Sequence, residues 1–306
     1  METIRIYDVT ARDGLQNEPE IVQTSDKRLL IEKLIDAGHT DIEVTSFVKP
    51  SWIPQLADSD SLVRILPPAP EGVRYWALIP NQRGLDRAFD CGIRHIATFM
   101  SASATHNRKN LNRTQRESLT SLRSVTEAAK AESMQVRAYL STVFGCPYEG
   151  NVHHQSVLSL TKELFAMGAD EVALGDTTGM ANPHQVRSLL SLLKEEDIDL
   201  SRIALHLHDT RGTALVNAYA GYLSGIRTFD GSAGGLGGCP YAPGASGNAA
   251  SEDLIQLFES MGIHTGVDLD KAANIGVFLE TLLGKTLPGR YYRFHQGKAC
   301  RNQHTA

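Results

Sequence analysis

The chain has 306 residues, of which 42% are hydrophobic, and a formal net charge of -5 at pH 7. This length can bury a full core as one large domain or two smaller ones. The small acidic excess leaves no basic surface for nucleic acid, and no apolar run is long enough to span a bilayer. Four cysteines are too few for a disulfide scaffold, and the first ten residues alternate like a strand, not a leader. We therefore expect a cytoplasmic protein that binds neither nucleic acid nor membrane.

Short β-branched and apolar runs recur along the chain and predict strands. They lie at 3–10, 40–47, 73–79, 95–100, 136–143, 171–177, 203–209 and 228–233. Amphipathic helical stretches separate most of them, for example at 25–38 and 153–168. Strand alternating with helix predicts a parallel sheet, and eight units in about 250 residues favour a closed (β/α)8 TIM barrel over an open, doubly wound sheet.

No linker or break in composition divides the chain. We therefore predict one catalytic barrel domain at 1–285, ending in a short C-terminal helical extension. The remaining segment, 286–306, is basic and lacks periodicity, which predicts an appendage that is partly disordered. We expect the fourth strand to be followed by a loop that carries Arg108 and Lys109.

Active sites of such barrels lie at the carboxyl ends of the strands. Polar side chains occur there on four of the predicted strands: Arg12 and Asp13, Glu43 and Ser46, Asp176 and Thr177, and His206 and His208.

The two histidines of "HLH" are the most informative pair. Because strand side chains alternate, His206 and His208 point to one face, while Leu205 and Leu207 point to the surrounding helices. A barrel interior is normally filled by branched apolar residues, so two inward imidazoles favour metal binding. The alternative is a hydrogen-bonded histidine pair.

Asp13 and one amide oxygen would complete an oxygen-rich site without thiolates. Such a site suits Mg²⁺ or Mn²⁺ rather than structural zinc. Asn248 is the candidate amide ligand. On local sequence alone it could equally be a turn residue or a helix N-cap.

The stretch "GGLGGCPYAPGASGN" (234–248) places Cys239 in a glycine-rich ribbon. It could be a phosphate cradle, a catalytic loop or a linker. It contains no lysine, which argues against a P-loop. Composition alone leaves the loop and the linker open.

Three motifs taken together resemble the 3-hydroxy-3-methylglutaryl-CoA (HMG-CoA) lyases. They are "RDGLQNE" (12–18), "HLHDT" (206–210) and "GLGGCPYAPGASGN" (235–248). The similarity continues through "TSFVKP", "GCPYEG" and "LGDTTG" and covers nearly the whole chain up to the basic tail. "RDG" and "HxH" alone are shared with a wider superfamily of metal-dependent barrel synthases and carboxyltransferases. The family's usual Gly-Pro before Arg-Asp is replaced here by Thr10 and Ala11.

The resemblance implies roles for individual residues. It implies divalent metal ligands at Asp13, His206, His208 and Asn248. It implies catalytic residues at Arg12, Cys239, Glu43 and Asp176. It implies substrate contacts from Arg12, Gln16, Ser46 and Thr177.

The implied reaction splits HMG-CoA into acetoacetate and acetyl-CoA with Mg²⁺ or Mn²⁺, in a homodimer. Arg12 would stabilise charge at the thioester oxygen, and Cys239, on a mobile loop, would protonate the enolate. The linker interpretation would leave this cysteine unexplained. Three alternatives are a lyase for a longer C3-branched 3-hydroxyglutaryl-CoA, a synthase condensing an acyl-CoA with a 2-oxo acid, and a non-catalytic barrel. Such synthases generally carry added C-terminal domains, for which we expect no room here.

Overall fold

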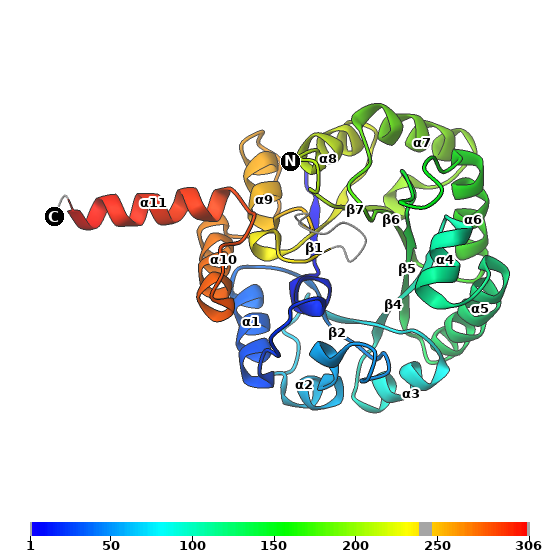
Figure 1. Cartoon of the computed structure of the whole chain (residues 1–306), viewed down its shortest axis with the longest axis horizontal. Helices are drawn as coiled ribbons and strands as arrows, with labels where there is room; N and C mark the ends of the chain where they lie inside the picture. Colours follow the sequence, from blue (N-terminus) through cyan, green and yellow to red (C-terminus); the bar gives the residue numbers. More distant parts are fainter. Residues whose placement is uncertain (1, 239–246, 305–306) are drawn as a thin grey trace.

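A closed ring of eight parallel strands organises the computed structural model, which describes residues 2–238 and 247–304. Each strand pairs with the next along the chain, and β1 pairs with β8 (Figure 1). The strands are β1 (Arg5–Asp8), β2 (Asp41–Ser46), β3 (Arg74–Leu78), β4 (His95–Ser101), β5 (Gln135–Ser141), β6 (Glu171–Asp176), β7 (Ile203–Leu207) and β8 (Thr228–Gly231). Each overlaps the run predicted for it, so the predicted (β/α)8 barrel is confirmed.

Helices surround this ring, except for the last one, which extends away from it (Figure 1). They are α1 (Thr24–Asp36), α2 (Ser59–Ile65), α3 (Gln82–Asp90), α4 (Ala104–Leu111), α5 (Gln115–Ala131), α6 (His154–Ala166), α7 (Pro183–Glu195), α8 (Ala214–Leu223), α9 (Ser251–Glu259), α10 (Leu269–Leu283) and α11 (Tyr291–His304). Short helical turns are η1 (Thr10–Gly14), η2 (Pro54–Leu56), η3 (Leu200–Arg202) and η4 (Ala233–Gly235). Within the described ranges, no helix has the length and apolarity needed to cross a bilayer.

Side-chain caps set where several helices begin. Thr114 and Glu117 form a capping box at the start of α5, and Asn182 and Gln185 form another at α7. Each box satisfies backbone N–H groups that the first turn leaves without helical partners. The Ser103 hydroxyl accepts from the third residue on and begins α4. The expectation of a loop around Arg108 and Lys109 is therefore wrong, because this cap supports a short helix that includes both residues.

The apolar core lies mainly between the strands and the helices. At one point the two layers approach so closely that only glycine fits: a Cβ on Gly221 of α8 would lie 2.4 Å from Leu205 of β7. Leu205 therefore packs outward, as its alternation predicts.

The barrel lumen is more polar than usual. Two small apolar clusters occupy part of it, one of them formed by Leu78, Ala97, Tyr139, Ala173 and Ala204. Residues two positions from these along the same strands face the same way, which places Arg137 and His206 in the lumen. Both are buried, as are Glu43 and Asp230. Buried charge in this number requires pairing, and the pairs build the site described below.

The C-terminal segment contains a helix that its weak periodicity did not predict. Residues 291–304 form α11, which extends beyond α10 and away from the barrel (Figure 1). Its first turn is anchored: the Tyr292 ring is buried against Gly276 of α10, and its hydroxyl donates to Leu287 O at 2.9 Å. Tertiary contacts at its start support this helix although its periodicity is weak. The partial disorder expected for 286–306 stays a prediction.

Candidate active site

The carboxyl ends of β1 and β7 bring three possible metal ligands together. Asp13 lies on η1, directly after β1, His206 lies on β7, and His208 follows that strand. One ligand atom from each lies within 4.8 Å of the other two. A carboxylate and two imidazoles at this spacing can share one cation.

The two imidazoles face each other through their Nε2 atoms, which are 3.2 Å apart. Burial, with His206 next in importance, lowers the pKa of His208 to about 4. His208 is therefore neutral near pH 7 and has a nitrogen lone pair to offer a cation. His206 Nδ1 lies 3.0 Å from the Asp230 carboxylate, on the opposite side of its ring from His208.

Arg12 links the candidate ligands to the lumen. Its Nη1 pairs with Asp13 and its Nε with Glu43. Burial by itself would lower the pKa of Arg12, but the two carboxylates outweigh it and hold that pKa above its ordinary value. Burial would likewise raise the pKa of Asp13, but Arg12 and then His206 hold it well below its ordinary range. Both groups are charged at neutral pH.

The Glu43 carboxylate accepts hydrogen bonds from three side chains. Its Oε2 accepts from the hydroxyls of Tyr7 at 2.9 Å and Tyr139 at 2.7 Å, while Oε1 accepts from Arg12. The Arg12 guanidinium also lies 5.5 Å from the centre of the Tyr139 ring. A carboxylate fixed by three donors fixes its partner in turn, so Arg12 has a defined orientation.

Asn248 is placed beside the other candidate ligands by a short bridge between its backbone and that of His208. Its side-chain amide donates to Asp13 Oδ2 at 2.9 Å and to Leu236 O at 3.1 Å. The alternative of a helix N-cap is wrong, because α9 begins at Ser251 and its N-cap is Ala250. Asn248 thus lies within reach of the cluster, and its role as a ligand stays a prediction.

A cavity of about 400 Å³ opens beside this cluster. Of the residues predicted for the site, six line it: Arg12, Asp13, Gln16, Thr177, His206 and His208. Apolar side chains also line it, among them Ile53, Leu78, Phe99, Leu111 and Leu122.

Four predicted residues do not line this cavity in the described structure. The Glu43 carboxylate pairs with Arg12 Nε. The Ser46 hydroxyl donates to Leu78 O at 3.2 Å. Asp176 accepts from the backbone of Met180 at 2.7 Å, and burial raises its pKa to about 6. Asn248 contacts Asp13. Cys239 lies outside the described residues.

Sequence reasoning missed three buried residues that the structure brings to the site. Tyr139 lines the cavity, Arg137 pairs with Asp230, and Asp230 contacts His206. Each lies within a run assigned to a strand from its apolar and β-branched neighbours. For two of them the sequence did carry a signal. Arg137 and Tyr139 are two positions apart on one strand, so strand alternation places both side chains on the same face.

The fold and this cluster together define a class: a (β/α)8-barrel protein with a candidate cation site at the carboxyl rim. The HMGL-like family model matches residues 3–278. The chain belongs to the HMGL-like family.

Curated relatives match along nearly their full length. The hydroxymethylglutaryl-CoA lyase of Bacillus subtilis is 50% identical over 94% of this chain and 95% of its own. A Pseudomonas aeruginosa protein named 3-hydroxy-3-isohexenylglutaryl-CoA/hydroxymethylglutaryl-CoA lyase is 43% identical over 92% of this chain and 94% of its own.

Solved structures agree. The B. subtilis HMG-CoA lyase superposes with a TM-score of 0.94 at 48% identity, covering 97% of this chain and 99% of its own. An Acinetobacter baumannii HMG-CoA lyase, solved with coenzyme A and 3-methylmalate, gives 0.90 at 38% identity, covering 95% of this chain and 94% of its own.

Proposed function

We propose that this chain is a lyase that cleaves HMG-CoA into acetoacetate and acetyl-CoA with a divalent cation. One observation carries the proposal: Asp13, His206, His208 and the fixed Arg12 border one cavity in a chain 50% identical to a curated lyase of this activity. The fit to a cation is supported by the two buried Nε2 atoms that face each other beside a carboxylate.

Asp13, His206, His208 and Asn248 would hold the cation, with Mg²⁺ or Mn²⁺ favoured by this mixture of oxygen and imidazole donors. When bound, such an ion polarises the substrate's C3 hydroxyl and makes its proton easier to remove.

The chain's own groups account for the rest of the reaction. The Asp13 carboxylate, ionised at neutral pH beside the cavity, takes the hydroxyl proton. Arg12 presents a permanent positive charge where enolate charge develops on the thioester oxygen as the carbon–carbon bond breaks. Glu43 acts through Arg12 by holding its Nε. Cys239 then supplies the proton that converts the enolate to acetyl-CoA.

A direct assay tests this function. The purified protein, HMG-CoA and Mg²⁺ should yield acetoacetate and acetyl-CoA in equal amounts, and EDTA should abolish the yield until Mg²⁺ or Mn²⁺ is restored. Full activity after exhaustive chelation would contradict the metal assignment. Condensation of an acyl-CoA with a 2-oxo acid, with no cleavage, would favour a synthase instead.

The second candidate function is cleavage of a related substrate with a longer branch at C3. It is favoured by the apolar side chains that line the cavity and by the P. aeruginosa relative whose name includes the isohexenyl substrate. Comparing kcat/KM for HMG-CoA and for 3-hydroxy-3-isohexenylglutaryl-CoA decides between them. A homodimer, testable by light scattering, and a cytoplasmic location stay predictions.

A further inference from the structure

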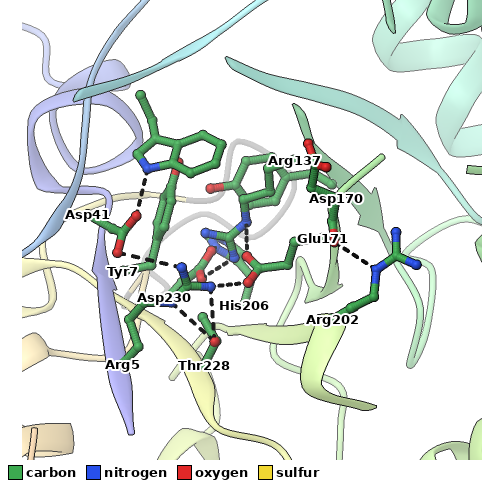
Figure 2. Close-up of polar contacts among 12 residues, drawn as sticks. Arg5, Tyr7, Asp41, Arg137, Asp170, Glu171, Arg202, His206, Thr228 and Asp230 are labelled. Carbon is green, nitrogen blue, oxygen red and sulfur yellow. Dashed lines mark hydrogen bonds and ion pairs between the residues drawn. The ribbon is translucent and has the colours of Figure 1, made fainter. Parts of the chain in front are cut away.

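A chain of three buried side chains runs across the barrel lumen to the candidate metal site. Figure 2 shows Arg137, Asp230 and His206 meeting there. They come from β5, β8 and β7, and Asp230 lies directly opposite His206 in the β7–β8 register. Arg137 Nη2 donates to Asp230 Oδ1 at 2.5 Å, and Asp230 Oδ2 lies 3.0 Å from His206 Nδ1.

Further contacts fix the orientation of the Arg137 and Asp230 side chains. Arg137 is fully buried, with its guanidinium 3.7 Å from the centre of the Tyr7 ring and its Nε 3.2 Å from Glu171. Both carboxylate oxygens of Asp230 are engaged, one by Arg137 and one by His206. A carboxylate held at both oxygens cannot turn away from the imidazole.

This contact decides which nitrogen of His206 carries the proton. A neutral imidazole has one N–H, and an aspartate carboxylate only accepts hydrogen bonds. The hydrogen must therefore be on Nδ1, which leaves the Nε2 lone pair directed at His208 and Asp13. His208 differs, because no described residue hydrogen-bonds its Nδ1.

We infer that Asp230, held by Arg137, is a positioning residue that fixes the His206 N–H on Nδ1 and so presents Nε2 to the cation. The inference rests on the proposed function for the presence of that cation. Carboxylates behind ligating histidines orient the ring, and losing one costs about 10- to 100-fold in metal affinity.

The isosteric variant Asp230→Asn gives the sharpest test. Arg137 can only donate, so it would draw the amide oxygen of the new side chain and turn the NH₂ toward His206 Nδ1. That nitrogen would have to accept, which moves the imidazole hydrogen to Nε2 and blocks ligation. A change of the same kind in a serine-protease triad leaves the geometry intact and lowers kcat by about 10⁴-fold.

Replacing Arg137 as well should relieve this effect. In the double variant Asp230→Asn/Arg137→Met, the amide can flip and offer its oxygen to His206 Nδ1–H. We expect Mn²⁺ affinity, measured by electron paramagnetic resonance, to fall about 10- to 100-fold in Asp230→Asn and to recover partly in the double variant. A purely structural role predicts the reverse order, with the double variant worse.

A matched control is Asp41→Asn. Asp41 is also buried and also paired with an arginine, accepting from Arg74 at 2.7 Å and from Trp76 at 2.8 Å. It begins β2 and contacts none of the candidate ligands, so this variant should keep the parent Mn²⁺ affinity. Thermal unfolding and circular dichroism confirm that each variant is folded.

The tautomer itself can be observed without metal or substrate. In ¹⁵N-histidine-labelled protein stripped of metal, NMR should show His206 protonated on Nδ1 in the parent and on Nε2 in Asp230→Asn. A parent His206 protonated on Nε2, or equal Mn²⁺ affinity in parent and Asp230→Asn, overturns the inference. If the parent binds no Mn²⁺ yet shows the Nδ1 tautomer, the proposed function fails while the positioning contact stands.

Discussion

The Nε of Arg12 and the carboxylate of Glu43 form a buried ion pair. The same carboxylate accepts from two tyrosine hydroxyls, while the other end of the guanidinium pairs with Asp13. Arg12 is thus held by Glu43 at its Nε and by Asp13 at its Nη1. A cation held this rigidly needs no reorganisation when charge develops on a substrate beside it.

Glu43→Gln should lower kcat by about 10- to 100-fold, the usual value of a hydrogen bond to a charged group. Glutamine keeps the shape but supplies one acceptor oxygen in place of two, so Arg12 loses its fixed direction. Steady-state kinetics and Mn²⁺ titration together check this. Unchanged kcat with a lower unfolding midpoint would mean that Glu43 serves stability alone.

Arg12→Lys should lower kcat by about 10²–10³-fold, as expected when one preorganised donor is lost. Lysine keeps the charge, but it has no planar fork to reach Glu43 and Asp13 together. Mg²⁺ affinity should change much less than kcat. Parent kcat in this variant would remove Arg12 from the reaction.

His208→Ala should weaken Mn²⁺ binding by more than about 100-fold, because it removes a ligand and not merely a supporting contact. The unfolding midpoint of the metal-free protein should change far less, since the His208 Nδ1 has no hydrogen-bond partner among the described residues. If affinity is kept while the midpoint falls, the histidines are a structural pair.

Cys239→Ser should lower turnover steeply while Mg²⁺ affinity stays near the parent value. A serine hydroxyl is too weakly acidic to donate a proton readily at neutral pH, whereas a thiol titrates much closer to it. Single-turnover kinetics with HMG-CoA provide the measurement. Turnover at the parent rate would exclude Cys239 as the proton donor.

Glu252→Gln should reduce the pH dependence of stability. Burial, with Asp253 second, raises the pKa of Glu252 from 4.5 to about 8 in the folded protein. The folded state then holds a proton that the unfolded state releases, so Glu252 makes the free energy of unfolding fall as pH rises from 4.5 to about 8. Urea unfolding at pH 5 and pH 8 should show a smaller difference in the variant, with some slope left from Asp253, whose pKa is also raised by burial. If the free energy of unfolding has the same pH dependence in variant and parent, Glu252 is not its source.

Much of the fold follows from local pattern. Alternation along each strand, and its regular exchange with helices, determined the barrel and the shared inward face of His206 and His208. The motifs around Asp13 and His206 also sufficed to place the candidate ligands at one rim, because all parallel strands of a barrel end there.

Where the sequence pattern was weak, tertiary contacts determined the local structure. α11 begins where Tyr292 packs on α10, although its own sequence has little periodicity. Asn248 could have been an N-cap or a ligand by sequence, and only the bridge to His208 placed it beside Asp13.

The sequence by itself determined which strands form and which of their faces turn inward, since both depend on a period of two residues within a segment. Only closure of the barrel brought the side chains of Arg137, Asp230 and His206 into contact with one another. Arg137 and Asp230 are 93 positions apart, and their contact depends on strand stagger and closure, which bring β5 side chains across the lumen to β8. No pattern within a single strand encodes that distance.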